Sequence, residues 1–169
     1  MKLLLAVDES PFSQEALQSV IDQFRPKDTQ VQVVNVVEPI EAYFSAEWFP
    51  HFTPYTEKVE QEREKQAGAL VQDVCAKLTK AGFRNSKVVL RGDARAAILD
   101  RASEWKPDLI VVGSHGLKGL NRLLMGSVSD AVVRHAACSV QIVRVRHGMK
   151  KDGPKPPARS RKSPKSKKR

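Results

Sequence analysis

Cysteine is scarce in this sequence, and long apolar runs are missing. Only two cysteines are present, Cys75 and Cys138, and neither has a second thiol or a histidine at ligand spacing. This excludes a disulfide framework and a structural zinc site. We expect buried free thiols at both positions, with a redox role as the alternative. No segment approaches the roughly 18 apolar residues of a membrane-spanning helix.

The apolar start of the chain, MKLLLAVDES, resembles a signal peptide for only a few residues. Its apolar run is too short for the core of a signal peptide, and acidic residues stand where small residues would precede a cleavage site. A buried first strand explains the run better. We therefore expect a cytoplasmic protein without a membrane span.

Positive charge is unevenly distributed along the chain. The 29 Lys and Arg and the 19 Asp and Glu give a net charge of +10. Residues 150–169 hold ten of the basic residues and one acid, which accounts for +9 of that total. Because residues 148–169 are also rich in Pro and Ser, we expect a disordered basic tail after a nearly neutral domain of residues 1–147. The tail could bind nucleic acid or another polyanion, or it could only aid solubility.

Apolar runs rich in β-branched residues alternate with helical patterns along residues 1–147. Ser10 is the expected N-cap of the first helix, with Pro11 at its first position. Gly82 is expected to end the second helix, and Asp93 to cap the third. The alternation predicts right-handed crossovers and a doubly wound, five-stranded parallel sheet of the α/β class. We expect strands at 2–7, 31–37, 87–91, 109–112 and 140–145, and later helices at 57–81, between Asp93 and Lys106, and at 127–136.

A glycine-rich segment joins the fourth expected strand to the last helix. It contains the pattern G-x2-G-x9-G-S, formed by Gly113, Gly116, Gly126 and Ser127. Glycine allows a sharp turn and a close approach of the backbone to a ligand. The start of the helix presents N–H groups and a positive dipole end, which suit a phosphate group. The pattern is neither a Walker A loop nor the dinucleotide fingerprint, and it predicts a nucleotide site, with ATP as the first candidate.

Two serines and one acid support this interpretation of the helix start. Ser127 and Ser129 would add hydroxyl donors for phosphate, and Asp130 fits a capping box with Ser127.

Asp8 follows the first strand, and ligands of open α/β sheets bind beyond the carboxyl ends of the strands where strand order reverses. If the first and fourth strands are neighbours, Asp8 faces the turn at Gly113. Asp8 is then a candidate for a ribose hydroxyl or a Mg²⁺ ion, with capping of the first helix as the alternative. We expect His115 to pack or to hydrogen-bond locally rather than act as a general base. Lys118 and Arg122 could reach phosphates or remain solvated.

Six of the ten aromatic residues lie between residues 39 and 56, and we expect a loop there. The loop could cover the adenine as a lid, or it could form an apolar patch for a partner, and its place after the second strand favours the lid. These aromatic residues are Tyr43, Phe44, Trp48, Phe49, Phe52 and Tyr55.

Three segments resemble a known family: AVDES, NVVEP and VVGSHG…GSVSDAVVRHAACSVQIVRV. They resemble the universal stress protein family, over residues 1 to about 145. The resemblance implies a Rossmann-like fold with sheet order 3-2-1-4-5 and a homodimer formed through the last strand, whose end residues are Val140 and Val145. Proteins with G-x2-G-x9-G-S/T resemble the ATP-binding branch of that family, and this chain has the pattern. Ser139 departs from the family, which often has proline before the last strand.

The resemblance also implies which residues bind ATP or another adenine nucleotide. Ala6, Val7 and Asp8 would line the ribose, with Mg²⁺ possible at Asp8, and the backbone of Val36 would meet the adenine. The residues around the phosphates would all belong to the glycine-rich segment: Gly113, Ser114, His115, Gly116, Gly126, Ser127, Val128 and Ser129.

Together these features predict an ATP-binding regulatory protein of the stress response that acts as a homodimer. The sequence contains no strong catalytic constellation, so hydrolysis or self-phosphorylation at Ser127 or Ser129 would be slow. One alternative is a slow ATPase or nucleotide transferase that uses Asp8 and Mg²⁺. The other is an interaction module without nucleotide, which works through the aromatic segment and the basic tail.

Overall fold

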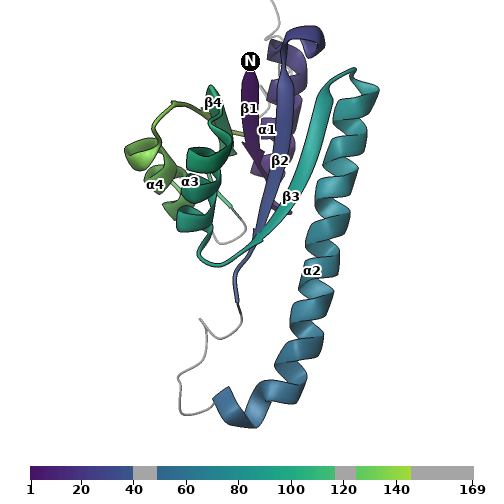
Figure 1. Ribbon diagram of the computed structural model, residues 1–169, viewed down its shortest axis with the longest axis vertical. Helices are drawn as coiled ribbons and strands as arrows, with labels where there is room; N and C mark the ends of the chain where they lie inside the picture. The colour runs from purple at the N-terminus through teal and green to yellow at the C-terminus, as the bar shows by residue number, and fades with distance from the viewer. Residues whose placement is uncertain (40–48, 117–124, 146–169) are drawn as a thin grey trace, which may run out of the picture.

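A parallel sheet with helices on both faces forms the structure (Figure 1). The computed structural model describes residues 1–39, 49–116 and 125–145, and of residues 49–57 only the backbone. In chain order the elements are β1 (Lys2–Ala6), α1 (Pro11–Gln23), the 3₁₀-helix η1 (Pro26–Asp28), β2 (Gln30–Val37), α2 (Phe49–Lys80), β3 (Arg84–Arg91), α3 (Ala94–Trp105), β4 (Leu109–Gly113), α4 (Ser127–His135) and β5 (Ser139–Val143).

The strand order is β3-β2-β1-β4-β5, and every neighbouring pair is parallel. This confirms the expected doubly wound α/β sheet and its order 3-2-1-4-5. The reversal of strand order lies at β1, where Leu3 is paired with Val31 of β2 on one side and with Leu109 of β4 on the other. The expected strand limits differ by up to three residues, since β3 begins earlier, at Arg84, and β5 ends earlier, at Val143.

Alternate residues of the central strands face opposite helix layers. Leu3 and Leu5 of β1 pack with α1 and α2, whereas Leu4 and Ala6 pack with α3 and α4, as the period of two along a strand requires. The first core includes Ala16, Val20, Val31, Val33, Val71 and Leu78, and the second includes Val34, Ile98, Ala102, Ile110 and Val132. Both faces of the sheet are thus covered, which explains the continuous apolar strands.

The expected helix ends are confirmed at three positions. Ser10 caps α1, accepting from the N–H of Ser13 at 3.3 Å, with Pro11 at the first position. Gly82 follows α2 with φ of 88°, in the left-handed region that glycine adopts without a steric penalty. Asp93 caps α3, and the guanidinium of Arg95 holds the pKa of Asp93 down at about 2, with help from a backbone N–H of the first helical turn.

Helix α2 begins at Phe49, eight residues before the expected start, so the expected loop over residues 49–56 is wrong. The loop was expected to reach residue 56, and Pro54 within it opposes a helix locally, because proline inside a helix removes one backbone hydrogen bond. Here the helix continues through Pro54, and the backbone of Phe49, Phe52 and Tyr55 is helical. The remaining aromatic residues of that segment (Tyr43, Phe44 and Trp48) lie outside the described residues, as do Lys118, Arg122 and the tail 148–169.

The two thiols differ in burial. Cys75 is buried, as expected, whereas Cys138 is half-buried. Burial raises the pKa of both thiols, and the charge of Asp108 raises the pKa of Cys138 further. A raised pKa leaves less of the reactive thiolate, which argues against a redox role.

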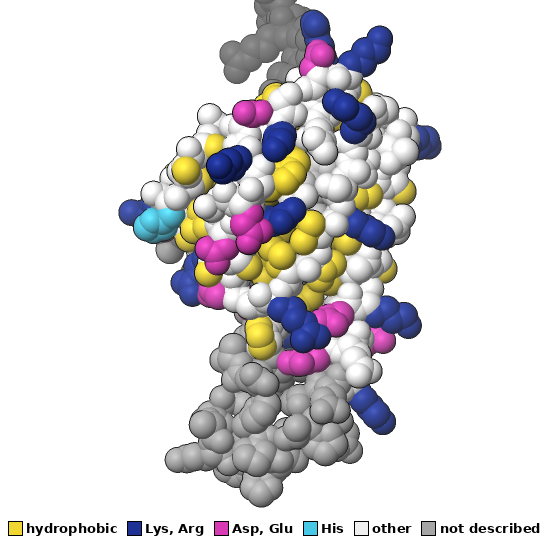
Figure 2. All heavy atoms as spheres, in the orientation of Figure 1, with side chains coloured by type: hydrophobic (Ala, Val, Ile, Leu, Met, Phe, Trp, Pro, Cys, Tyr) yellow, Lys and Arg dark blue, Asp and Glu magenta, His cyan; other side chains and the backbone are white. Residues whose placement is uncertain are grey.

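Charges of both signs are interspersed over the described part of the face in Figure 2. This agrees with a nearly neutral folded domain. Within the described ranges, no helix is both long and apolar enough to cross a membrane.

Candidate functional site

Asp8 and the glycine-rich turn meet at the carboxyl ends of β1 and β4. The two strands are neighbours, with Ala6 paired to Val112, so the residues that follow them leave the sheet side by side. A Cβ placed on Gly116 would lie only 2.8 Å from Oδ2 of Asp8. The expected approach of Asp8 to this turn is therefore confirmed, and the carboxylate lies against a position that only glycine can occupy without a shift.

Gly113 and Gly126 are required by contacts within the chain itself. A Cβ on Gly113 would lie 2.8 Å from Cβ of Phe12 and 3.0 Å from its carbonyl carbon. A Cβ on Gly126 would lie 3.2 Å from the carbonyl oxygen of Ser114. The first glycine lets α1 pack against the end of β4, and the other lets α4 start close to the end of the same strand.

The first turn of α4 differs from those of α1 and α3. Its N-cap is Gly126, with φ of −64°, and no side chain caps it. The expected capping box of Ser127 with Asp130 is wrong, because the N-cap is Gly126 and the helix starts one residue earlier than the box requires. Asp130 instead pairs with Arg134 at 2.9 Å, one turn further along. The N–H groups of the first turn of α4 are thus left without a side-chain cap, as an anion site requires.

The two serines of this turn have different surroundings. Ser127 is exposed at the first helical position. Ser129 is only 2% exposed, and its hydroxyl lies 2.9 Å from the carbonyl oxygen of Gly126 and 3.1 Å from that of Ser114. The hydroxyl of Ser129 thus hydrogen-bonds within the protein. Ser127 is the accessible hydroxyl of the pair.

In the described part of this turn a hydroxyl lies beside a ring nitrogen, with Ser114 Oγ 3.1 Å from His115 Nδ1. Ser114 is 3% exposed, and its N–H donates to the carbonyl of Val143 at 2.7 Å. The His115 ring packs on Phe12, with centroids 5.0 Å apart. A serine buried to this extent cannot meet a substrate, and the ring contact agrees with the expected packing role of His115.

On the β1 side, the expected site residues offer backbone groups. Ala6 and Val7 are 8% and 6% exposed and belong to the two cores, while Val36 is half-buried on β2. Asn35 donates from Nδ2 to the carbonyl of Val7 at 2.8 Å, fixing the residue before Asp8. Sequence reasoning missed Asn35, because a polar residue in a buried strand carries no signal for which carbonyl it meets.

Ser13 is a second residue whose role was missed. Asp8 Oδ1 accepts from the hydroxyl of Ser13 at 2.6 Å and from the N–H of Ser10 at 3.0 Å, and the Ser10 hydroxyl also donates to it. The N-cap itself is Ser10, so Asp8 supports the start of α1 without being its cap. The signal was present in the sequence as two serines, two and five residues after the aspartate.

Metal ligands do not gather in the described parts of the chain: no group of three or more His, Cys, Asp or Glu side chains there could hold an ion. Asp8 offers one carboxylate at the turn. A Mg²⁺ ion that is also bound by nucleotide phosphates needs only one or two carboxylates, so the site fits such an ion only when the ion arrives with a nucleotide.

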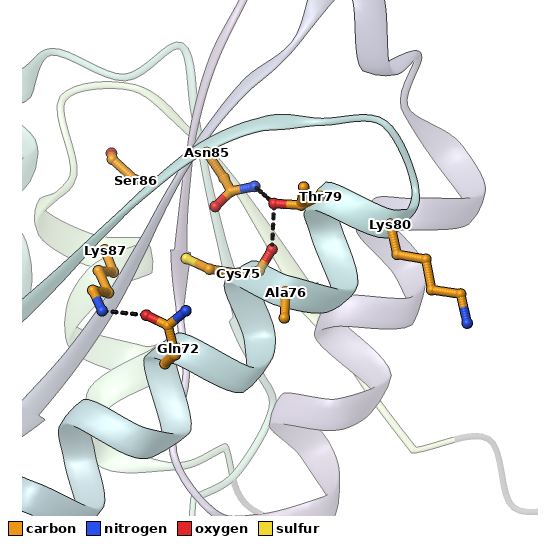
Figure 3. A pocket seen from close by; sticks show the side chains of 8 residues that line it. All are labelled: Gln72, Cys75, Ala76, Thr79, Lys80, Asn85, Ser86 and Lys87. Carbon is orange, nitrogen blue, oxygen red and sulfur yellow. Dashed lines mark hydrogen bonds between the residues drawn. The ribbon is translucent and has the colours of Figure 1, made fainter.

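A separate pocket of about 620 Å³ lies between α2 and β3 (Figure 3). Asn85 donates to Thr79 Oγ1 at 2.9 Å, and Lys87 bonds to Gln72. The side chain of Lys80 points away from the pocket in Figure 3. Asn85 is near the amino end of β3, whereas Asp8 and Gly116 follow the carboxyl ends of β1 and β4. The pocket and the glycine-rich turn therefore lie at opposite ends of the parallel strands. The pocket is not part of the candidate site.

Comparison with known proteins identifies the family. The universal stress protein family matches residues 1–144. The chain belongs to the universal stress protein family. A putative universal stress protein of Staphylococcus haemolyticus is 33% identical over 144 residues, which cover 84% of this chain and 83% of that protein.

Solved structures of universal stress proteins have the same fold. One from Arabidopsis thaliana, with AMP bound, is 21% identical with a TM-score of 0.56, covering 85% of this chain and 91% of that one. One from Archaeoglobus fulgidus, in complex with dAMP, is 20% identical with a TM-score of 0.58, covering 85% of this chain and 97% of that one. The resemblance noted in the sequence is thus confirmed for family and fold.

Proposed function

We propose that this universal stress protein binds ATP, or another adenine nucleotide, at the carboxyl ends of β1 and β4. One observation carries the proposal: the N-terminus of α4 lacks a side-chain cap and follows the turn in which Gly116 lies against Asp8. A ligand at this place could put an anionic group at the N-terminus of α4 and a hydroxyl group at the carboxylate of Asp8. Two relatives with the same fold support the choice of ligand, because their structures hold AMP and dAMP.

In this proposal each part of the nucleotide meets a different group. The phosphates meet backbone N–H groups of Ser127, Val128 and Ser129 in the first turn of α4 and the hydroxyl of Ser127. The ribose meets Asp8, and the adenine meets the backbone of Val36. A Mg²⁺ ion would be bound mainly by the phosphates and would add charge compensation near Asp8.

The proposal is tested by calorimetric titration of ATP with Mg²⁺ into the wild type and Ser127→Glu. An acidic residue in the first turn favours the helix dipole, so the fold is retained, but the carboxylate repels the phosphates. We expect affinity to fall by about tenfold or more. Gly116→Val is a poorer probe, since its Cβ would lie 2.8 Å from the Asp8 carboxylate and would displace it.

Ala76→Glu is the matched control for this experiment. Ala76 is exposed on α2, beside the amino end of β3 and away from the glycine-rich turn. Lys80, four residues further along the helix, can pair with the new carboxylate. Ala76→Glu adds the same charge as Ser127→Glu, and its affinity for ATP should stay at the wild-type value. If the wild type fails to bind ATP, the nucleotide proposal is wrong; an equal loss in both variants would show a general charge effect instead.

We further propose that the protein is a regulatory homodimer in the cytoplasm. The edge strand β5 supports pairing with a second copy, because Val140, Ile142 and Val143 are only half-buried there. An edge strand presents unpaired N–H and C=O groups to another chain. The ten basic residues of 150–169 support contact with nucleic acid or another polyanion.

A further inference from the structure

Strand β3 forms one edge of the sheet, and half of its backbone groups point away from β2. The N–H of Gly92, just after the strand, donates to the carbonyl of Val37 on β2. Residues two apart along a strand direct their N–H and C=O to the same side, so Leu90 also faces β2. Lys87 and Val89 therefore direct their N–H and C=O to the open edge, where the described part of the chain places no further strand.

Helix α2 runs along this edge and is joined to β3 by two polar contacts. Lys87 bonds to Gln72, and Arg91 bonds to Glu64, about two turns closer to the start of the helix. Between these contacts, Val89 is 36% exposed on the same face of β3. An apolar side chain is thus left partly open between the helix and the strand.

The groove between α2 and β3 is hollow on both sides of the contact between Lys87 and Gln72. Towards the amino end of β3 lies the pocket of about 620 Å³, where Ala76 and Thr79 form part of the wall on α2 (Figure 3). Both of these residues are exposed. Towards the carboxyl end of β3, a Cβ added to Gly68 would meet no atom within 4 Å. Side chains of an added strand would therefore have room against α2.

The amino half of this edge is basic. Lys80 and Arg84 are exposed on either side of the turn between α2 and β3, and Lys87 is exposed further along the strand. Among the described residues, no ion pair includes any of the three. Opposite charges on neighbouring strands attract, so an acidic side chain suits the position beside Lys87.

The acids of α2 do not cancel this charge. Asp73 pairs with Lys77 on the helix itself, at 2.7 Å. Glu64 bonds to Arg91, which also feels the charge of Glu60, so the carboxyl half of the edge is not basic. The complementary charge of a partner segment should therefore lie over the amino half of β3.

The opposite face of β3 is apolar beside the same edge. Val88 and Leu90 are half-buried there and pack against the core beneath α3 and α4. Side chains of an added strand alternate between the two faces of the sheet, so every second residue would lie beside these two. Apolar residues at those positions would cover them. The edge thus favours a segment in which acidic and apolar residues alternate.

A second copy of this chain does not suit the edge. Pairing of two β3 strands would bring Arg84, Lys87 and Arg91 of one copy beside the same residues of the other. Like charges on paired strands are destabilising. The occupant that fits the charge is an acidic segment of another protein.

We propose that the open edge of β3 binds an extended acidic segment of a partner protein. The segment adds to the sheet as a further strand and directs an acidic side chain to Lys87, beside the pocket between α2 and β3. In this mode of recognition, main-chain hydrogen bonds supply affinity and the side chains of alternate residues supply specificity. The surface is separate from the proposed nucleotide site, because the pocket lies at the amino end of β3.

The test adds a hexapeptide of alternating Glu and Val to the full chain at about 150 mM salt, which weakens contacts between exposed charges. Hydrogen exchange of single backbone amides, followed by NMR, reports where the peptide binds. At about ten times the Kd of the peptide, the amides of Lys87 and Val89 should exchange about tenfold more slowly. The amide of Leu90 faces β2 and should change less. A hexapeptide of alternating Lys and Val should slow neither of the first two amides.

Three variants test the role of charge, with the Kd taken from the NMR shift of the Val89 amide. Lys87→Glu should weaken binding of the Glu-Val peptide about tenfold, because an attractive pair becomes a repulsive one. Lys87→Arg keeps the charge and should keep the wild-type Kd. Arg144→Glu makes the same change of charge at an exposed residue just after β5, at the other edge of the sheet, and should also keep it.

Each other outcome overturns the inference. Equally slowed exchange with both peptides would show strand addition without a preference for acidic residues. Unchanged exchange at Lys87 and Val89 would show that the Glu-Val peptide does not pair with β3, even if it binds to the basic residues of 150–169. The basic side chains of β3 would then only protect the edge against pairing. None of these outcomes depends on whether the protein binds ATP.

Discussion

Glycine residues in this chain have roles that depend on what surrounds them. Gly113 lies against the backbone of Phe12, and Gly116 lies against Asp8, whereas a Cβ on Gly68 in the middle of α2 would meet no atom within 4 Å. At the first two positions the absence of a side chain is required by contacts. At Gly68 it only increases the conformational freedom of the unfolded chain.

Substitution of alanine at two of these positions should therefore have opposite effects on stability. Gly113→Ala places a Cβ 2.8 Å from a side-chain atom and 3.0 Å from a backbone atom of Phe12, and should lower the free energy of unfolding. A loss of about 1–3 kcal/mol is typical of an overpacked site. Gly68→Ala should raise it by about 0.5–1 kcal/mol. Urea denaturation of both variants and the wild type measures these changes.

An unchanged stability of Gly113→Ala together with weaker ATP binding would contradict this explanation. It would mean that α1 can shift away from β4 and that Gly113 is needed by the ligand, as the sequence analysis assumed.

At the level of single residues, the sequence allowed some contacts to be predicted and not others. The approach of Asp8 to the Gly116 turn could be predicted, because it follows from strand order alone. The contacts of Ser10 and Ser13 with Oδ1 could not, because they depend on side-chain torsions within a short connection. Ser10 was expected only as a helix cap, and no role was expected for Ser13.

Secondary-structure elements were predicted best where packing and local preference agree. The five strands and their parallel pairing follow from apolar runs and right-handed crossovers, whereas their order was expected from the resemblance to universal stress proteins. The start of α2 was not predictable in the same way, because Pro54 opposes a helix locally and yet the helix runs through it. The start of α4 at Ser127 agrees with the expected helix over 127–136, but the capping role was given to Ser127 instead of Gly126, since glycine and serine are both common N-caps.

The edge strand β5 gives a prediction about assembly. In a strand the N–H and C=O of one residue point to the same side, and the carbonyl of Val143 accepts from Ser114 at the end of β4. Val143 therefore faces β4, and its neighbour Ile142 faces the open edge. Ile142→Pro removes an N–H from that edge only. If β5 pairs with a second copy, this variant should be monomeric by light scattering, where the wild type is dimeric.

Ile142→Ala is the matched control, because it removes the same side chain and keeps the N–H. It should remain a dimer. A wild type that is monomeric at all concentrations would contradict the proposed assembly, and a monomeric Ile142→Ala protein would assign the contact to side chains rather than to the strand edge.

At the level of the whole molecule, charge is separated between the folded domain and the end of the chain. The net charge is +10, and residues 150–169 account for +9 of it. Figure 2 shows side chains of both signs over the described part of the visible face. Whatever the nucleotide controls, binding to a polyanion should depend on residues 150–169 rather than on the domain.

This dependence can be measured as the salt sensitivity of binding to duplex DNA of random sequence. Each phosphate neutralised by Lys or Arg contributes a slope of about −0.9 in log K against log salt. If six or more of the ten basic residues make contact, affinity of the full chain should fall at least about a thousandfold between roughly 50 and 200 mM salt.

A chain ending at Gly148 should lose the binding, and one with residues 150–169 in shuffled order should keep it, because counterion release does not depend on sequence. Equal binding by the shortened chain would place the contact on the folded domain. If the full chain does not bind DNA even at the lower salt concentration, residues 150–169 do not bind polyanions and only aid solubility.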